Sequence, residues 1–323
     1  MDFVQQQAKN IRKTYLLVAL FMIMMVFLGF FIDVIFSIFP IVTLLMVTIA
    51  TVQVLVGIGS GPSLVLKSVQ AKPLSDDSFE EKQLSNIVEE VCVACGLSHI
   101  PKVYVIEDSS INAFATGFSP EKSAVCVTRG LLDELNREET EGVIAHEISH
   151  VLNKDTLLMT MVSAILGTIV LVQIVAWRTL WGYGRFGRIS KGKRGRDSSG
   201  YVFLALLMIA AVATLFALLG RITVFAVSRT REYFADARAS ELTRNPKGLA
   251  NALRKIARNE KMKVASIATA HLFIADPLKR KVNERHGKLA NLFSTHPPIH
   301  MRIAILEGVD AETVYKELYE VKG

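Results

Sequence analysis

Four long runs of apolar residues without a single charge constrain this chain more than any other feature of its sequence. They are Tyr15–Ile32, Val34–Ile58, Leu157–Val175 and Tyr201–Leu219. Each is about 18 to 25 residues long, which as a helix matches the roughly 30 Å hydrocarbon thickness of a bilayer. A helix buried in a soluble protein rarely avoids charge on every face. The chain is therefore predicted to be an integral membrane protein with two transmembrane hairpins, at residues 1–60 and 157–220.

Composition supports this prediction and excludes several other classes of protein. The chain is 51% hydrophobic with a mean hydropathy of +0.36, which excludes a disordered chain. Its formal charge is +7, and the loop 178–200 carries seven Lys and Arg against one Asp. Such a loop can bind nucleic acid or anionic lipid. Because only Trp181, Tyr183 and Phe186 offer aromatic stacking near it, we predict contact with anionic lipid and no nucleic-acid partner.

The distribution of basic residues predicts the orientation in the membrane. Lys9, Arg12 and Lys13 precede the first run, whereas the turn after it carries only Asp33. Because basic residues stay on the cytoplasmic side, the N-terminus is expected in the cytoplasm. The second hairpin is ambiguous, since two full crossings would place its basic loop outside. Either this hairpin is re-entrant or interfacial, or the folded domain beside it overrides the charge rule.

Outside the hairpins, residues 61–156 and 221–323 have the patterns of a small α+β domain in two parts. Strands are expected at 102–106 and 123–128, with a third at 112–118. Helices are expected at 78–95, from the cap Asn136 to about 153, and at 231–242, 249–258 and 299–306. The predicted fold class is thus mostly α, with a small sheet in the soluble domain.

The helix capped by Asn136 carries the sequence His-Glu-Ile-Ser-His at 146–150. Residues four apart share one helix face, so His146 and His150 can bind one metal ion while Glu147 holds a water beside it. The alternative is an exposed helix with two unrelated histidines. Lys154 and Asp155 after the motif indicate that this helix ends in water, which argues against a site buried inside the membrane.

A catalytic zinc takes three protein ligands and leaves a position for water. The residues just after His150 contain no third histidine, so a glutamate on another helix is the expected ligand. Glu232 is the best candidate, with Asp236 one turn further along to hydrogen-bond a ligand histidine and fix its tautomer. The alternative is a solvated charge pair between Glu232 and a neighbouring arginine.

In combination, HEISH, SRTREYFAD, INAFATGF and STHPP around two hydrophobic hairpins resemble the HtpX membrane proteases, relatives of the CAAX prenyl endopeptidases. The resemblance covers the chain from the first run to its end. It implies a zincin-type metalloprotease domain with one Zn²⁺ per chain, held by His146, His150 and Glu232, and Glu147 as the catalytic glutamate. It also implies a multi-pass protein of the inner or plasma membrane whose active site faces the cytoplasm. Misfolded or damaged membrane proteins would be its substrates, in stress response and protein quality control.

Two further roles are predicted for residues near the site. His296 is the candidate donor to the oxyanion of the transition state, because Pro297 and Pro298 hold its chain rigid before a helix at Ile299. The resemblance supports a site role for this histidine. By the same resemblance Asn112, Ala113 and Phe114 belong to an edge strand whose free backbone groups bind substrate as an added strand.

Short connections to the membrane runs predict where the metal lies. His150 is seven residues before Leu157, and Glu232 is 13 residues after Leu219. At about 1.5 Å per helical residue, these connections reach at most about 10 and 20 Å. The metal is therefore expected close to the membrane face.

Two other classes of function compete with a protease. A catalytically silent membrane scaffold could keep zinc for structure, but structural zinc is normally closed by four protein ligands. A four-span transporter would need ionisable residues inside its spans, and none of the four runs contains one. Zinc-dependent peptide hydrolysis therefore agrees best with the sequence.

Overall fold

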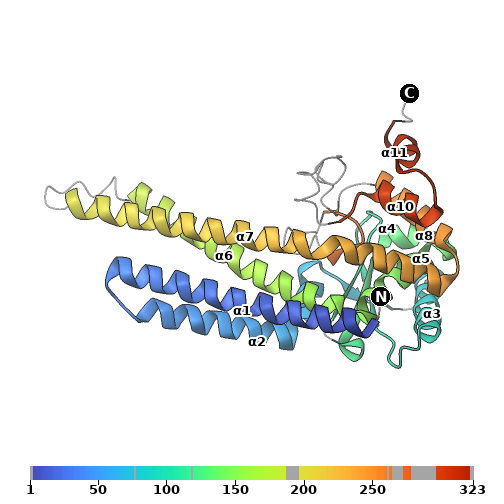
Figure 1. The fold of residues 1–323 in the computed structure, drawn as a ribbon, viewed down its shortest axis with the longest axis horizontal. Coiled ribbons are helices and arrows are strands. Elements are labelled where there is room, and N and C mark those ends of the chain that lie inside the picture. Colours follow the sequence, from blue (N-terminus) through green and yellow to red (C-terminus); the bar gives the residue numbers. More distant parts are fainter. Residues whose placement is uncertain are drawn as a thin grey trace. The chain divides into compact units, whose positions relative to one another are not determined.

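A computed structural model describes residues 3–75, 78–117, 119–186, 196–259, 262–263, 272–277 and 296–320 (Figure 1). The chain divides into two compact units. One, the membrane unit, comprises residues 15–59 and 161–223, and the other, the sheet unit, comprises residues 1–14, 60–160 and 224–323. The sequence placed residues 1–60 in one hairpin, but residues 1–14 belong to the sheet unit.

Long helices supply the membrane unit. They are α1 (Phe3–Phe36), α2 (Ile41–Ser68), α6 (Asp155–Phe186) and α7 (Arg196–Thr243), as Figure 1 shows. By length and composition, four segments of these helices can cross a membrane: Asn10–Phe36, Ile41–Ser68, Asp155–Tyr183 and Gly200–Gly220. Three of the predicted apolar runs are thus confirmed as helical throughout, whereas the run Val34–Ile58 begins in the end of α1 and a turn, and its helix α2 starts only at Ile41. Of the basic loop 178–200, residues 187–195 lie outside the described part of the chain.

Asp33 does not end the first helix, as its charge suggested, but lies in the last turns of α1. Its carboxylate accepts hydrogen bonds from the backbone N–H groups of Val42 and Thr43 at 2.9 Å each, and from the Thr43 hydroxyl at 2.7 Å. These two N–H groups belong to the first turn of α2, where backbone N–H groups have no hydrogen-bond acceptor within their own helix. Gly29 lets the helices approach, because a Cβ there would lie 2.6 Å from Thr43 Cα. Asp33 therefore caps α2 across the hairpin.

The sheet unit contains a four-stranded sheet in the order β1-β2-β4-β3. The strands are β1 (Lys72–Pro73), β2 (Lys102–Ile106), β3 (Ala113–Gly117) and β4 (Ser123–Thr128). β2 and β4 run parallel, whereas β3 pairs antiparallel with β4. All three strands expected from the sequence are present, and β3 lies at an edge of the sheet.

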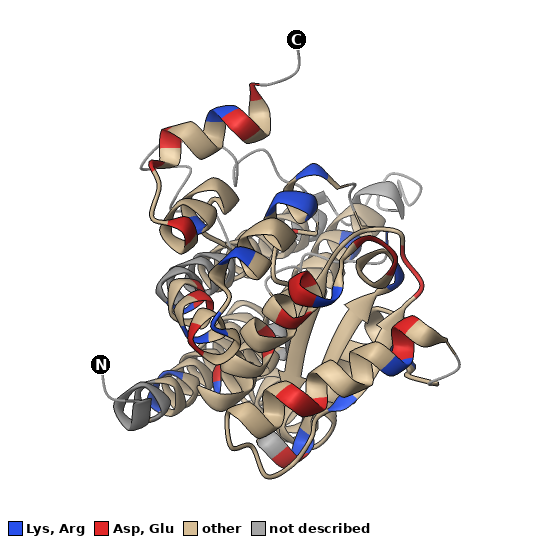
Figure 2. Cartoon of the chain, turned by 90° about the vertical axis from the view of Figure 1, so that its right-hand side faces the viewer, with Lys and Arg blue, Asp and Glu red and all other residues tan. Residues whose placement is uncertain are grey.

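Helix α5 (Arg137–Leu152) carries the histidine motif and lies against β3, α3 and α8. Asn136 caps it as predicted, in a capping box with Glu139. Gly142 is required by the close approach of α8, since a Cβ there would lie 2.7 Å from Leu249 N. The other helices are α3 (Phe79–Ala94), α4 (Arg129–Glu134), α8 (Pro246–Arg258), α10 (Ile299–Glu307) and α11 (Ala311–Tyr319). Charges of both signs are interspersed over the helices, while the strands carry few (Figure 2).

Candidate metal centre

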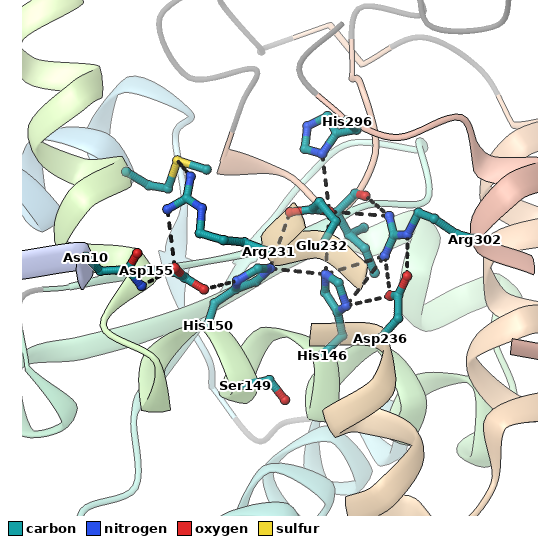
Figure 3. A network of polar contacts seen from close by, with 12 residues as sticks. Asn10, His146, Ser149, His150, Asp155, Arg231, Glu232, Asp236, His296 and Arg302 are labelled. Atoms are coloured by element: carbon teal, nitrogen blue, oxygen red, sulfur yellow. Dashed lines mark hydrogen bonds and ion pairs between the residues drawn. The ribbon is translucent and has the colours of Figure 1, made fainter. Parts of the chain in front are cut away.

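Three side chains from two helices converge in the sheet unit. His146 and His150, one turn apart on α5, bring their Nε2 atoms within 3.2 Å of each other. Glu232 on α7 places Oε1 3.5 Å from His150 Nε2 and Oε2 3.8 Å from His146 Nε2. One donor atom of each residue lies within 4.8 Å of the other two (Figure 3). Two imidazole nitrogens and one carboxylate in this arrangement can hold one metal ion.

Asp236 orients His146, one turn along α7 from Glu232. Its Oδ1 lies 2.9 Å from His146 Nδ1, so Nε2 is the ring nitrogen directed at the convergence point (Figure 3). Burial lowers the pKa of His146, which keeps its imidazole neutral, as a metal ligand must be. Burial alone would raise the pKa of Glu232, but hydrogen bonds from His150 and His296 hold it well below its usual range. The sequence prediction for Asp236 thus agrees with its contact.

Arg302 completes this side of the centre, and the sequence reasoning missed it. Its side chain is fully buried, and Nε and Nη2 donate to the two carboxylate oxygens of Asp236 at 2.8 and 2.7 Å. Nη1 donates to the carbonyl of Ile274 at 2.7 Å and lies 3.5 Å from Glu232 Oε2. One signal could have found it: Arg302 is the single charged residue in the apolar segment 299–306. Such a charge is buried only when it has partners.

His150 is oriented by Asp155, the first residue of α6. Asp155 Oδ2 lies 3.1 Å from His150 Nδ1, and Oδ1 accepts from Asn10 Nδ2 at 2.7 Å and Arg231 Nη1 at 3.3 Å. The expectation that Asp155 marks a helix end in water was wrong. Asp155 is only 1% exposed, because its partners enclose the carboxylate. Neither Asn10 nor Arg231 was predicted to reach the site.

Glu147 lies beside the three donors and is 1% exposed. Its Oε1 has no hydrogen-bond partner among the described residues. Burial raises the pKa of Glu147 to about 7. A small cavity borders this carboxylate and is lined by Ala115, Glu147, His150, Asp155, Thr156, Met159, Glu232 and Leu272. A buried carboxylate with an unpaired oxygen facing a cavity is suited to receive a proton from a water held there.

Buried carboxylates outnumber buried guanidinium groups around the centre. Four carboxylates (Glu147, Asp155, Glu232 and Asp236) and two guanidinium groups (Arg231 and Arg302) are each at most 3% exposed. Burial alone would lower the pKa of His150, but hydrogen bonds with Asp155 and Glu232 raise it to about 10, so a proton on this ring supplies positive charge between the carboxylates. A cation held by the two imidazoles and Glu232 would take the place of that proton, because a histidine binds metal in its neutral form.

The structure places His296 next to a predicted ligand. Its Nδ1 lies 3.4 Å from Glu232 Oε2, and the side chain is buried. The helix expected after Pro297 and Pro298 is α10, which begins at Ile299 as predicted. Figure 3 shows His296 on the opposite side of Glu232 from Asp236. This position is close enough for a site role, and donation to an oxyanion stays a prediction.

The predicted substrate contacts on β3 differ from expectation. On the side of β3 that faces β4, Thr128 N donates to the Asn112 carbonyl. In an antiparallel pair of strands, hydrogen-bonded residue pairs alternate with pairs that are not hydrogen-bonded. The backbone N–H and C=O groups of residues 113, 115 and 117 therefore point away from β4. The Ala113 carbonyl is not free, because it accepts from Ile274 N at 2.8 Å. Phe114 forms a bridge with Phe273.

Asn112 takes part in the same contact, since its Nδ2 donates to the Ala275 carbonyl at 3.2 Å. The prediction that the backbone groups of Asn112, Ala113 and Phe114 are open to substrate was therefore wrong, because those of Asn112 and Phe114 face β4 and the Ala113 carbonyl is occupied. The physical reason is that the chain's own residues 273–275 add to this end of the edge strand. Ala115 is the next residue whose backbone groups point outward. Its N–H donates to the Glu147 carboxylate, and the residue lines the cavity beside Glu147.

Comparison with known proteins agrees with this geometry. The model of peptidase family M48 matches residues 78–310, which include all the residues that converge on the centre except Asn10. The chain belongs to peptidase family M48. It is therefore a metallopeptidase, and its four apolar helices make it a multi-pass membrane protein. The resemblance inferred from the sequence motifs is confirmed.

Several M48 relatives match nearly the whole chain. Proteins described as "Protease HtpX homolog" are 41% identical in Caldanaerobacter subterraneus subsp. tengcongensis and 40% in Thermoanaerobacter pseudethanolicus, each match covering 94% of this chain and 96% of the relative. One from Listeria monocytogenes is 39% identical over 94% of this chain and 99% of its own length. The crystal structure of S. mikatae Ste24p aligns with a TM-score of 0.49 at 19% identity, covering 87% of this chain and 62% of that one.

Proposed function

We propose that this M48 peptidase is a zinc-dependent endopeptidase of the cytoplasmic membrane that cleaves misfolded or damaged membrane proteins. The observation that carries the proposal is the convergence of His146, His150 and Glu232 beside the unpaired oxygen of Glu147. Three protein donors leave a coordination position for a reactant, as in catalytic zinc sites. A silent scaffold would have no use for a buried carboxylate at that position.

Each residue around the centre is proposed to have a separate role in peptide hydrolysis. When bound, zinc supplies a Lewis acid that polarises the scissile carbonyl and acidifies water. Glu147 accepts the proton of the attacking water on Oε1 and passes it to the leaving amine. Asp236 and Asp155 hold His146 and His150 with their Nε2 atoms directed inward. His296 is proposed to donate to the developing oxyanion.

Substrate is proposed to bind along the part of β3 that the chain leaves uncovered. Residues 273–275 contact the strand as far as Phe114, and the Ala115 N–H donates to Glu147, so an added substrate strand would pair from the Ala115 carbonyl onward. Ala115 lines the cavity beside Glu147, which would bring the scissile bond to the catalytic carboxylate. This revises the substrate-binding role predicted for Asn112, Ala113 and Phe114.

One contact in the sheet unit supports a proposal for the orientation of the site. Asn10 is hydrogen-bonded to Asp155, which favours placing the N-terminal segment and the metal centre on the same side of the membrane. Lys9, Arg12 and Lys13 in that segment favour the cytoplasmic side. We therefore propose an active site that faces the cytoplasm. Contact between the basic loop and anionic lipid remains part of the proposal.

Metal analysis tests the proposed chemistry. The full chain purified in detergent is expected to hold one zinc ion, and to lose cleavage of an unfolded membrane protein on chelation and regain it with zinc. His146→Ala combined with Glu232→Ala should lose the zinc, because one ligand remains. His99→Ala, which removes an exposed histidine, is the control and should keep both. Zinc retained by the double variant would contradict the assigned ligands, and zinc without any cleavage would favour the scaffold.

A second prediction concerns substrate presentation. Because His150 and Glu232 are 7 and 13 residues from the apolar runs, the site is proposed to act close to the membrane face. An unfolded segment anchored in the same proteoliposomes should be cleaved at least about tenfold faster than the same segment free in solution, since anchoring raises its effective concentration. Initial cleavage rates of the two substrates measure this ratio. Equal rates would contradict a membrane-adjacent site.

A further inference from the structure

We propose that the segment before the first membrane run, residues 1–14, contributes to the metal centre, with Asn10 as a positioning residue for the ligand His150. Asn10 acts through Asp155, which holds the histidine ring. The inference rests on the proposed metal site, but it concerns residues that no ligand assignment includes. If so, the start of α1 both precedes a membrane helix and helps to orient a metal ligand.

The Asn10 side chain bridges the point where one helix ends and the next begins. It is fully buried, and its Nδ2 donates to the backbone carbonyl of Asn153 at 3.0 Å and to Asp155 Oδ1 at 2.7 Å. Asn153 is the C-cap of the histidine helix α5, and Asp155 begins α6. Both N–H groups of one amide are therefore used at the exit of the helix that carries His146 and His150. Figure 3 shows the one that reaches Asp155.

Asp155 transmits this contact to the metal ligands. While Oδ1 accepts from Asn10, Oδ2 lies 3.1 Å from His150 Nδ1. Oδ1 also accepts from Arg231 Nη1 at 3.3 Å, and Arg231 is the neighbour of Glu232. One carboxylate thus connects α1, α5 and α7. A carboxylate held on both oxygens fixes the orientation of the ring it contacts, and such partners strongly affect metal affinity.

The chemistry of Asn10 favours a positioning role over simple packing. Burying an amide is unfavourable unless it is hydrogen-bonded, and a leucine would pack a helix against an apolar neighbour without that cost. Thr14 offers the contrast one turn later. It is also buried, but its hydroxyl donates only to the backbone carbonyl of Asn10 in its own helix. Asn10 and Thr14 therefore differ in whether they reach the centre.

The test compares metal binding of full-length variants in detergent. Asn10→Leu is expected to weaken zinc binding about three- to tenfold, and Asp155→Ala about 10- to 100-fold, measured by competition with a chromophoric chelator. Thr14→Val is the matched control and should bind as the wild type does. Because Asn10 has no carboxylate to hold once Asp155 is gone, adding Asn10→Leu to Asp155→Ala should weaken binding no further.

Two more readouts separate positioning from general destabilisation. In cobalt-substituted protein, Asn10→Leu should change the visible absorption bands, because the His150 ring is less firmly oriented, whereas Thr14→Val should not. Thermal unfolding of the metal-free protein should be similar in both variants. Unchanged zinc affinity and cobalt bands in Asn10→Leu, or equal changes in Thr14→Val, would overturn the inference. A wild type that binds no zinc would instead refute the proposed function itself.

Discussion

Glu147→Gln should abolish peptide cleavage while leaving the metal and the fold in place. The amide has nearly the same shape but cannot accept the proton of the attacking water, and loss of a general base costs about 10²- to 10⁴-fold in rate. Glu147 is not one of the three residues that can hold the metal, and its Oε1 has no partner among the described residues. Turnover of an unfolded membrane substrate, with zinc content measured in parallel, gives the result.

Glu139→Gln is the matched control for this prediction. Glu139 is a buried carboxylate in the first turn of the same helix, where it forms the capping box with Asn136. Glutamine also serves at that position of a capping box. This variant should cleave at close to the wild-type rate. Substantial cleavage by Glu147→Gln would show that another group accepts the proton and would remove Glu147 from its proposed role.

Arg302→Met should strongly destabilise the sheet unit. It would leave Asp236 buried with only His146 to contact, and breaking a buried ion pair in this way typically costs about 3–5 kcal/mol. The free energy of unfolding in detergent and urea, followed by circular dichroism, measures the loss. Zinc affinity should fall as well, because Asp236 orients His146.

Arg254→Met provides the comparison. Arg254 on α8 also forms ion pairs, with Glu307 at 2.6 Å and Glu317 at 2.9 Å, but these groups are partly exposed to solvent. Removing Arg254 should cost about 1 kcal/mol or less, because water can solvate the two carboxylates that are left. If the two variants lost similar stability, the assignment of Arg302 as a buried support of the centre would be wrong.

Local spacing explains which parts of this protein could be predicted. The four apolar runs, the capping box at Asn136 and the one-turn spacing of His146 and His150 are properties of neighbouring residues. The pairing of Glu232 with Asp236 on a second helix follows from the same periodicity. Within one element, helix geometry alone places side chains on a common face. The sequence by itself therefore determined the membrane helices and the chemistry of the donor set.

Only the tertiary structure decided what surrounds those donors. Asp155 and Arg302 are charged, which suggests exposure, yet both are buried because partners from distant segments compensate them. Asn10 is 145 residues from Asp155, and contacts at such a separation leave no periodic pattern to detect. The occupation of β3 by residues 273–275 likewise depends on how the chain returns to the sheet. Spacing along a helix is dictated locally, whereas burial of a charge depends on everything that packs against it.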